Sequence, residues 1–212
     1  MLALRENRKK LVLEKRSFSD RLRDIDMFFQ NKGRVHQTMR RMAKRLERAK
    51  ISYAVVGGLA LNAHGYERTT KDVDLLLSRR SFETFCRKFV GKNYVRISGR
   101  PRRFVDRSNG VRIDILVTGL FPGTGKPGPI AFPDPKLVRE KIEEYQVVNL
   151  PTLVELKLAA RRWRDFADIV EIIRANNLDE SFLEHLHSSV HRDFVECLEE
   201  KRREDEYEAR QE

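Results

Sequence analysis

The chain has 212 residues, 40% hydrophobic and 35% charged, so it can bury one sizeable core beneath a strongly ionic surface. Its net charge of +11 favours polyanionic partners such as nucleic acid, nucleotides or an anionic membrane surface. Two cysteines argue against a disulfide framework, and no apolar run reaches the roughly 18 residues that a membrane span needs, so we expect a cytoplasmic protein with no membrane partner.

Residues 1–50 are predicted to form a basic helical extension. Leu11–Phe29 is expected to be one helix, and a second is indicated by apolar residues that recur at intervals of three and four. These apolar positions are Val35, Met39, Met42 and Leu46. Six basic side chains crowd the rest of that segment: Arg34, Arg40, Arg41, Lys44, Arg45 and Arg48. They form either the solvated outer face of a packed helix, which we favour, or a binding surface for the phosphates of RNA or DNA.

Residues 51–150 alternate between short apolar runs and helical patterns, which predicts a core with a mixed β-sheet. We expect strands at 53–56, 73–77, 93–97, 103–106, 111–117 and 146–149. We expect helices at 59–64, 81–90 and 136–144. The segment 119–135 is rich in glycine and proline and is expected to be irregular, and a loop of that length in a compact domain is usually functional or mobile.

Residues 151–212 are predicted to form a helical C-terminal lobe. Helices are expected at 153–163 and 165–175, a break at Asn176-Asn177, and one or two further helices from Ser181 to the end. The predicted fold class is therefore α+β, with a mixed β-sheet core, a helical C-terminal lobe and a basic helical N-terminal extension.

A glycine pair and two acids stand out within the predicted core. Gly57-Gly58 ends one apolar strand and leaves backbone N–H groups bare, where phosphate oxygens could bind. Asp72 and Asp74 begin the next strand, and residues two apart in a strand point to the same face. Two carboxylates at such a short distance repel each other unless a cation neutralises them. Divalent metal ions prefer such oxygen ligands. This combination indicates chemistry on a nucleotide.

A third acid, Asp114, lies on a later strand, on the face opposite Ile113 and Ile115. It is either an ordinary residue of a half-exposed strand or the third member of a metal-binding cluster. Sites that hold a pair of metal ions need several carboxylates from neighbouring strands. With Asp72 and Asp74, this residue would complete such a set.

These residues resemble the nucleotidyltransferase fold of the DNA polymerase β superfamily, and most closely the AbiEii-type toxin nucleotidyltransferases. The first matching motif is Gly57-Gly58-Leu59-Ala60-Leu61, His64-Gly65, Arg68, Thr70 and Asp72-Val73-Asp74-Leu75. The second is Leu153-Val154-Glu155-Leu156-Lys157-Leu158-Ala159-Ala160 and Arg164-Asp165-Phe166-Ala167-Asp168. The likeness covers residues 52–175, and residues 1–50 match nothing in it.

The resemblance implies catalytic roles for Asp72, Asp74, Asp114 and Lys157, with the three aspartates as ligands of Mg²⁺ or Mn²⁺. From its apolar neighbours alone, Lys157 is instead an ordinary lysine with a packed stem and an ammonium group that reaches out to solvent.

The resemblance also implies a nucleotide-binding set. Gly57 and Gly58 would hold phosphate oxygens, Arg68 would contact a phosphate or the acceptor, and Lys157 and Asp168 would lie near the nucleotide.

The function that this resemblance implies is transfer of a nucleoside monophosphate from an NTP to an acceptor hydroxyl. The positive charge of the chain favours RNA as the acceptor, such as a tRNA end. An antitoxin protein is implied as a partner by the resemblance alone. Two alternatives stay open: the same chemistry on a protein or small-molecule acceptor, and a catalytically silent module that binds nucleotide or RNA.

Overall fold

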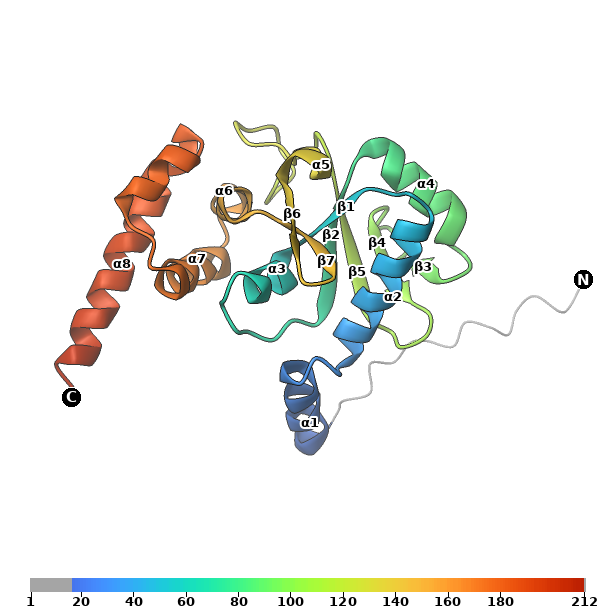
Figure 1. Cartoon of the computed structure of the whole chain (residues 1–212), viewed down its shortest axis with the longest axis horizontal. Helices are drawn as coiled ribbons and strands as arrows, with labels where there is room; N and C mark the ends of the chain where they lie inside the picture. The colour runs from blue at the N-terminus through green and yellow to red at the C-terminus, as the bar shows by residue number, and fades with distance from the viewer. Residues whose placement is uncertain (1–16, 212) are drawn as a thin grey trace, which may run out of the picture.

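A seven-stranded mixed sheet forms the centre of the protein, in the order β3-β4-β5-β2-β1-β7-β6. The computed structural model describes residues 17–211 (Figure 1). The strands are β1 (Tyr53–Val56), β2 (Asp72–Leu77), β3 (Tyr94–Arg96), β4 (Arg103–Asp106), β5 (Arg112–Val117), β6 (Arg139–Ile142) and β7 (Tyr145–Val148). Strand β2 lies in the middle, parallel to β5 on one side and antiparallel to β1 on the other.

Eight α-helices and two short 3-10 turns complete the described part of the chain. The helices are α1 (Phe18–Phe29), α2 (Arg34–Arg48), α3 (Gly57–Ala63), α4 (Arg79–Phe89), α5 (Pro135–Val138), α6 (Leu150–Ala160), α7 (Trp163–Asn176) and α8 (His191–Ala209). The 3-10 turns are η1 (Glu180–His185) and η2 (Ser188–Val190). The predicted α+β class, with a mixed sheet and a helical C-terminal lobe, is confirmed. Of the helix expected at Leu11–Phe29, residues 11–16 lie outside the described residues, and α1 begins at Phe18.

Helix α2 packs its apolar stripe against the sheet. The stripe predicted from the sequence is buried, and it belongs to the same hydrophobic core as the strands. Two arginines of its outer face also bind the protein: Arg41 Nη2 lies 2.8 Å from Asp106 Oδ2, and Arg45 donates a 3.0 Å hydrogen bond to the Tyr94 hydroxyl. These contacts fit a packed helix with a basic outer surface.

Helix α4 covers the β3–β4 end of the sheet through aromatic side chains. Ser78 caps its first turn, as its hydroxyl accepts a hydrogen bond from the Ser81 N–H. The Phe85 ring is buried 5.5 Å from the Tyr94 ring and 5.3 Å from the Phe104 ring, measured between centroids. Such aromatic pairs add specific packing energy to the area they bury, and they hold the edge strands in place.

The prediction of a helix at Lys136–Glu144 is wrong. Only one turn, α5, forms there, and its N-cap is Asp134. The residues after it form β6, which pairs antiparallel with β7 through a tight turn where Glu143 has a φ of 51°. Pairing with a neighbouring strand outweighs a weak helical preference in so short a segment.

The C-terminal lobe packs α6 and α7 side by side, with α8 against α7 at the far side from the sheet (Figure 1). Asn149 caps α6 and Arg161, with a φ of 52°, ends it, so the chain turns sharply into α7. Arg174 of α7 binds Glu204 (2.8 Å) and Asp205 (3.5 Å) of α8. Among residues 17–211, no helix has both the length and the apolar character that a membrane span requires.

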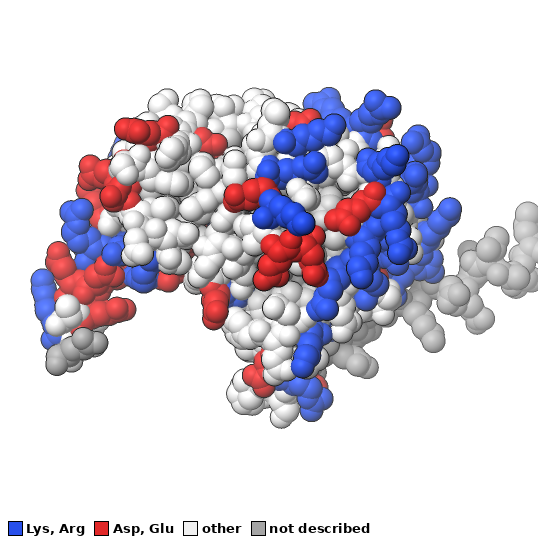
Figure 2. All heavy atoms as spheres, in the orientation of Figure 1, with Lys and Arg blue, Asp and Glu red and all other residues white. Residues whose placement is uncertain are grey.

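Basic side chains gather on one side of the molecule, over α2 and α4 at the right of the view in Figure 2. On α4 these are Arg79, Arg80, Arg87 and Lys88. Acidic side chains in this view lie mainly in the centre and over the C-terminal helices, so the net positive charge is unevenly distributed.

Candidate functional site

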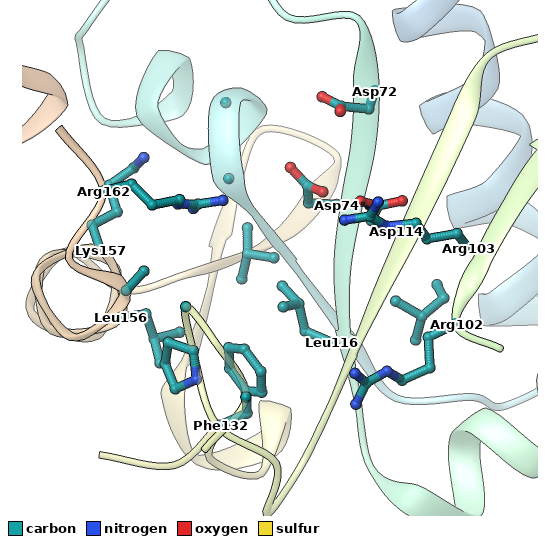
Figure 3. Close-up of a pocket in the computed structure, with 18 of the residues that line it drawn as sticks. Asp72, Asp74, Arg102, Arg103, Asp114, Leu116, Phe132, Leu156, Lys157 and Arg162 are labelled. Atoms are coloured by element: carbon teal, nitrogen blue, oxygen red, sulfur yellow. Dashed lines mark ion pairs between the residues drawn. The ribbon is translucent and has the colours of Figure 1, made fainter. Parts of the chain in front are cut away.

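A cleft of about 770 Å³ lies between the sheet and the C-terminal lobe. Strands β2 and β5 and the turn before β4 form one wall, and α6 with the start of α7 forms the other (Figure 3). The glycine-rich loop expected to be irregular closes part of the cleft, with Phe121 to Gly125 among its lining residues. A Cβ atom on Gly123 would lie only 2.7 Å from the Ala160 carbonyl oxygen, so this loop packs tightly on the end of α6.

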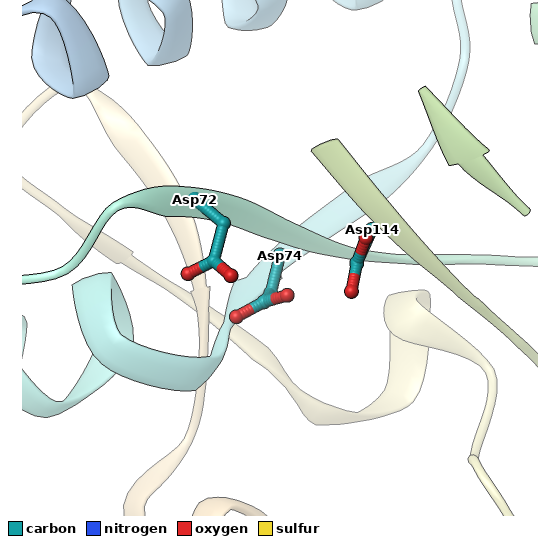
Figure 4. A group of neighbouring side chains, drawn as sticks. All are labelled: Asp72, Asp74 and Asp114. Carbon is teal, nitrogen blue, oxygen red and sulfur yellow. The ribbon is translucent and has the colours of Figure 1, made fainter. Parts of the chain in front are cut away.

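Three aspartates meet on the sheet face of this cleft (Figure 4). Asp72 and Asp74 project from β2, and Asp114 projects from β5, where the parallel register pairs it with Asp74. Each of the three offers an oxygen, and these oxygens lie within 4.8 Å of one another. Across residues 17–211, this is the one group of three or more His, Cys, Asp or Glu side chains with that geometry. We call it the aspartate triad.

Gly57 brings the backbone directly beneath Asp74. Its φ is 66°, a conformation that costs other residues energy, and a Cβ atom there would overlap a carboxylate oxygen of Asp74. A Cβ atom on Gly58 would lie 2.8 Å from the Thr70 Cβ. Both glycines are therefore required by close approach, which places the start of α3 against the triad.

Asp72 is held ionised by its neighbours. Partial burial alone would raise its pKa, but hydrogen bonds from Arg112 and from the Thr70 hydroxyl (2.8 Å) outweigh this and lower the pKa below its ordinary value. Arg112 lies on β5 directly beside Asp72 in the sheet register, so the ion pair follows from the strand pairing.

Asp74 has the opposite electrostatic environment. Burial, followed by repulsion from Asp72 and Asp114, raises its pKa to about 7, although Lys157 and Arg112 act in the other direction. The ionised form of Asp74 is therefore electrostatically unfavourable in the folded protein at neutral pH, and a bound cation would stabilise it.

Asp114 is also short of partners. Burial is the main cause that raises its pKa, and Arg103, 3.1 Å from its Oδ2 atom, only partly offsets this. Its Oδ1 atom is buried and accepts no hydrogen bond from the described residues, with the Arg112 Nε atom at 3.9 Å. Buried polar atoms normally have a hydrogen-bond partner, so an oxygen without one is suited to coordinate a metal ion. All three donors are carboxylates, the ligands that Mg²⁺ and Mn²⁺ prefer, and the residues therefore fit such an ion.

Lys157 is the centre of a buried ion network on the other wall. Its Nζ atom lies 2.5 Å from Asp168 Oδ2 and 3.1 Å from Asp165 Oδ1, instead of reaching out to solvent. Arg68 binds the second oxygen of Asp168 at 2.5 Å, and Arg162 binds Asp165 at 2.5 Å. Because Arg68 follows α3 and Asp168 lies on α7, this network joins the lobe to the core.

The structure thus gathers every residue predicted for the site around one cleft: Gly57, Gly58, Arg68, Asp72, Asp74, Asp114, Lys157 and Asp168. Their roles as metal ligands and nucleotide contacts stay predictions.

Sequence reasoning missed Arg103, Arg112 and Arg162. Arg112 could have been found, because it lies two residues before Asp114 and so shares its face of the strand. Arg103 reaches the triad only through the pairing of β4 with β5, which the sequence does not specify. Arg162 lines the cleft because the chain turns between α6 and α7.

Comparisons with known proteins match no family model and no curated protein. Similar solved structures include a provisionally named nucleotidyltransferase from Thermotoga maritima, 17% identical, with 70% of this chain and 92% of that chain covered and a TM-score of 0.41. JHP933 from Helicobacter pylori is 14% identical, with coverages of 79% and 78% and a TM-score of 0.43. The CdnE cyclic dinucleotide synthase from Elizabethkingia meningoseptica is 12% identical, with coverages of 70% and 60% and a TM-score of 0.29.

Proposed function

We propose that this protein is a metal-dependent nucleotidyltransferase that moves a nucleoside monophosphate from an NTP to an acceptor hydroxyl. The observation that carries the proposal is the aspartate triad, with its unsatisfied Asp114 oxygen and its strained Asp74, directly above the backbone at Gly57. Repulsion from Asp72 and Asp114 adds to burial in raising the pKa of Asp74, and a bound cation would offset this cost.

The charge of the cleft supports a triphosphate substrate. Eight cationic side chains line it, against four acidic ones. The cations are Arg68, Arg100, Arg102, Arg103, Arg112, Lys157, Arg162 and Arg164. A cleft with this surplus attracts a polyanion and neutralises part of its charge.

The proposed reaction assigns each part of the cleft a task. The acceptor oxygen bonds to the α-phosphorus, the bond from this phosphorus to the bridging oxygen breaks, and pyrophosphate leaves. Mg²⁺ or Mn²⁺, when bound by the triad, supplies the neutralisation of phosphate charge. Gly57 and Gly58 leave room for phosphate oxygens near their N–H groups, and Asp114 takes the acceptor proton.

RNA, such as a tRNA end, is the proposed acceptor. The net charge of +11 and the basic side over α2 and α4 support a polyanionic acceptor over a cationic small molecule. A toxin-like role, with an antitoxin protein as a partner, rests on the motif resemblance of residues 57–75 and 153–168.

Incubation of the full chain with each radiolabelled NTP and Mg²⁺ or Mn²⁺ tests the proposal, with separate pools of tRNA, protein and small molecules as acceptors. We expect label on RNA, lost when EDTA is added. Asp74→Asn should lower the rate by about 10²- to 10³-fold or more, because it removes a group that stabilises the transition state. Asp26→Asn, a change of an exposed acid on α1, is the control and should leave the rate unchanged.

Other outcomes identify the alternatives. Label on protein or on a small molecule changes the acceptor and keeps the chemistry. No label in any pool, together with nucleotide or RNA binding that ignores metal, replaces the enzyme with a silent binding module. A normal rate for Asp74→Asn contradicts the role of the triad.

A further inference from the structure

The turn between α6 and α7 exposes an aromatic ring among arginines at the edge of the cleft. Its two residues, Arg161-Arg162, and the first two of α7, Trp163-Arg164, are all exposed, and Trp163, the only tryptophan of the chain, is 93% accessible to solvent. Full exposure of so large an apolar side chain loses the energy that burial would provide, so it indicates a surface used for binding.

The position of this turn relative to the triad is fixed by its neighbours. Arg162 and Arg164 both line the cleft, and Trp163 stands between them, with its Cα atom about 3.8 Å from each of theirs. In Figure 3, Arg162 lies on the opposite side of the view from Arg103, with Asp74 and Asp114 between them. Arg164 is near enough to Asp72 to help lower its pKa. The backbone of Trp163 therefore lies at the edge of the cleft, and its exposed ring is not among the residues that line the cleft.

The turn is also held firmly in place. Arg161 binds Asp193 of α8 at 2.5 Å, and Arg162 binds the buried Asp165 at 2.5 Å. Arg164, in contrast, forms no ion pair or hydrogen bond with any residue that the structure describes, so its guanidinium group is available to a ligand. An exposed aromatic ring next to a held turn and beside an available arginine matches the pairing that binds single strands, a base on the ring and a phosphate on the cation.

We propose that Trp163 stacks on an unpaired nucleobase of the acceptor strand while Arg164 binds a neighbouring phosphate. This inference rests on the proposed function, because it takes a nucleic-acid strand as the acceptor. A base of the NTP is the other possible source of the same ring, but Trp163 faces solvent outside the cleft that would hold the NTP. A protein partner is less well matched, since the sequence neighbours of Trp163 on both sides are arginines and give no contiguous apolar surface.

Fluorescence titration of the full chain tests the proposal, because all indole emission comes from Trp163. The buffer contains EDTA and no NTP, so turnover does not enter the measurement. We expect a single-stranded RNA 12-mer to quench the emission. An abasic strand of the same length, which keeps the phosphates but lacks the rings, should bind more weakly and quench little. Each NTP alone should also quench little.

Substitutions separate stacking from charge. Trp163→Ala should weaken 12-mer binding, measured by anisotropy of a labelled strand, by roughly 5- to 150-fold and leave abasic-strand binding unchanged. Trp163→Phe should restore most of the affinity and Trp163→Leu should not. Tyr207→Ala, which removes another exposed aromatic ring at 64% exposure on α8, is the matched control and should have no effect.

Equal binding of abasic and intact strands, or unchanged affinity of Trp163→Ala, overturns the proposal. If an NTP alone quenches the emission as strongly as the 12-mer does, Trp163 stacks on the donor nucleotide and the proposal is overturned. It is also overturned if Trp163→Ala weakens only the binding of a protein partner. The proposed function fails separately, when Asp74→Asn transfers normally or no acceptor is labelled. Stacking on Trp163 can survive that failure, because it is measured without metal or NTP.

Discussion

Asp74 is the residue whose protonation most directly reports on the triad. Its folded pKa, about 7, is above its ordinary value of 3.8, so between these values the folded state binds more protons than the unfolded state. The free energy of unfolding therefore falls as pH rises through this window and stays low above it. The carboxylate makes the metal-free protein less stable at pH 8 than at pH 5.

We expect the melting temperature in EDTA to fall by about 5–10 °C more between pH 5 and pH 7 for the natural chain than for Asp74→Asn. Above pH 7, Asp74→Asn should be the more stable protein. Differential scanning calorimetry at several pH values gives both results. Parallel pH profiles for the two proteins would show that Asp74 ionises normally.

Gly57 is predicted to control the position of the Asp74 carboxylate. Gly57→Ala places a Cβ atom where an Asp74 oxygen lies, so transfer and Mn²⁺ binding should both fall by about 10²-fold or more. Gly91→Ala is the matched control, because Gly91 also has a positive φ, 84°, and nothing lies within 4 Å of its added Cβ. Both variants carry backbone strain, but only Gly57→Ala displaces the acid. Equal activity of the two variants would contradict this.

At the scale of elements, Asp106 attaches α2 to the end of β4. It is buried and accepts hydrogen bonds from Thr38 (3.0 Å) and Arg41 (2.8 Å), both on α2. Burial opposes its ionisation, but hydrogen bonds from Arg41, Ser108 and Thr38 lower its pKa below 3.8. Its stabilising contribution is therefore complete at neutral pH and is lost as pH falls below its ordinary pKa.

Asp106→Ala should destabilise the protein by about 2–4 kcal/mol, since it removes the buried carboxylate that accepts from Thr38 and Arg41 of α2 and from Ser108. The melting temperature at pH 7 should fall by roughly 5–15 °C. Asp26→Ala, at an exposed position of α1, should change it by about 1 °C or less. An equal effect of the two substitutions would show that Asp106 does not fix α2.

Elements differ in how far the sequence predicts them. Strands β1, β2 and β5 were predictable because apolar runs with clear boundaries mark them, and α2 because its apolar stripe repeats at helical spacing. Strand β6 was not, since the run Arg139-Glu140-Lys141 shows no apolar face and becomes a strand only by pairing with β7. Likewise the three aspartates could be found from spacing, whereas Arg103 joins them only through the register of two strands.

For the whole molecule, the surplus of positive charge predicts how RNA binding depends on salt. Each phosphate that the protein neutralises releases counterions, so four to six contacts should weaken binding by about 50- to 300-fold between 50 and 200 mM salt. Anisotropy of a labelled single strand at a series of KCl concentrations measures the slope. Affinity that does not change with salt would show that the basic cleft and the side over α2 and α4 do not bind phosphates.

Because β2 lies between two partner strands, the site is sensitive to any insertion or deletion in this strand. Its backbone is hydrogen-bonded on both edges, to β1 and to β5, so a single inserted or deleted residue cannot be absorbed by local bending. A slip of one position would turn Asp72 and Asp74 to the other face of the sheet and point Val73 and Leu75 into the cleft. The exposed stretch 124–129 of the glycine-rich loop can therefore change in length at less cost than the strand that carries the acids.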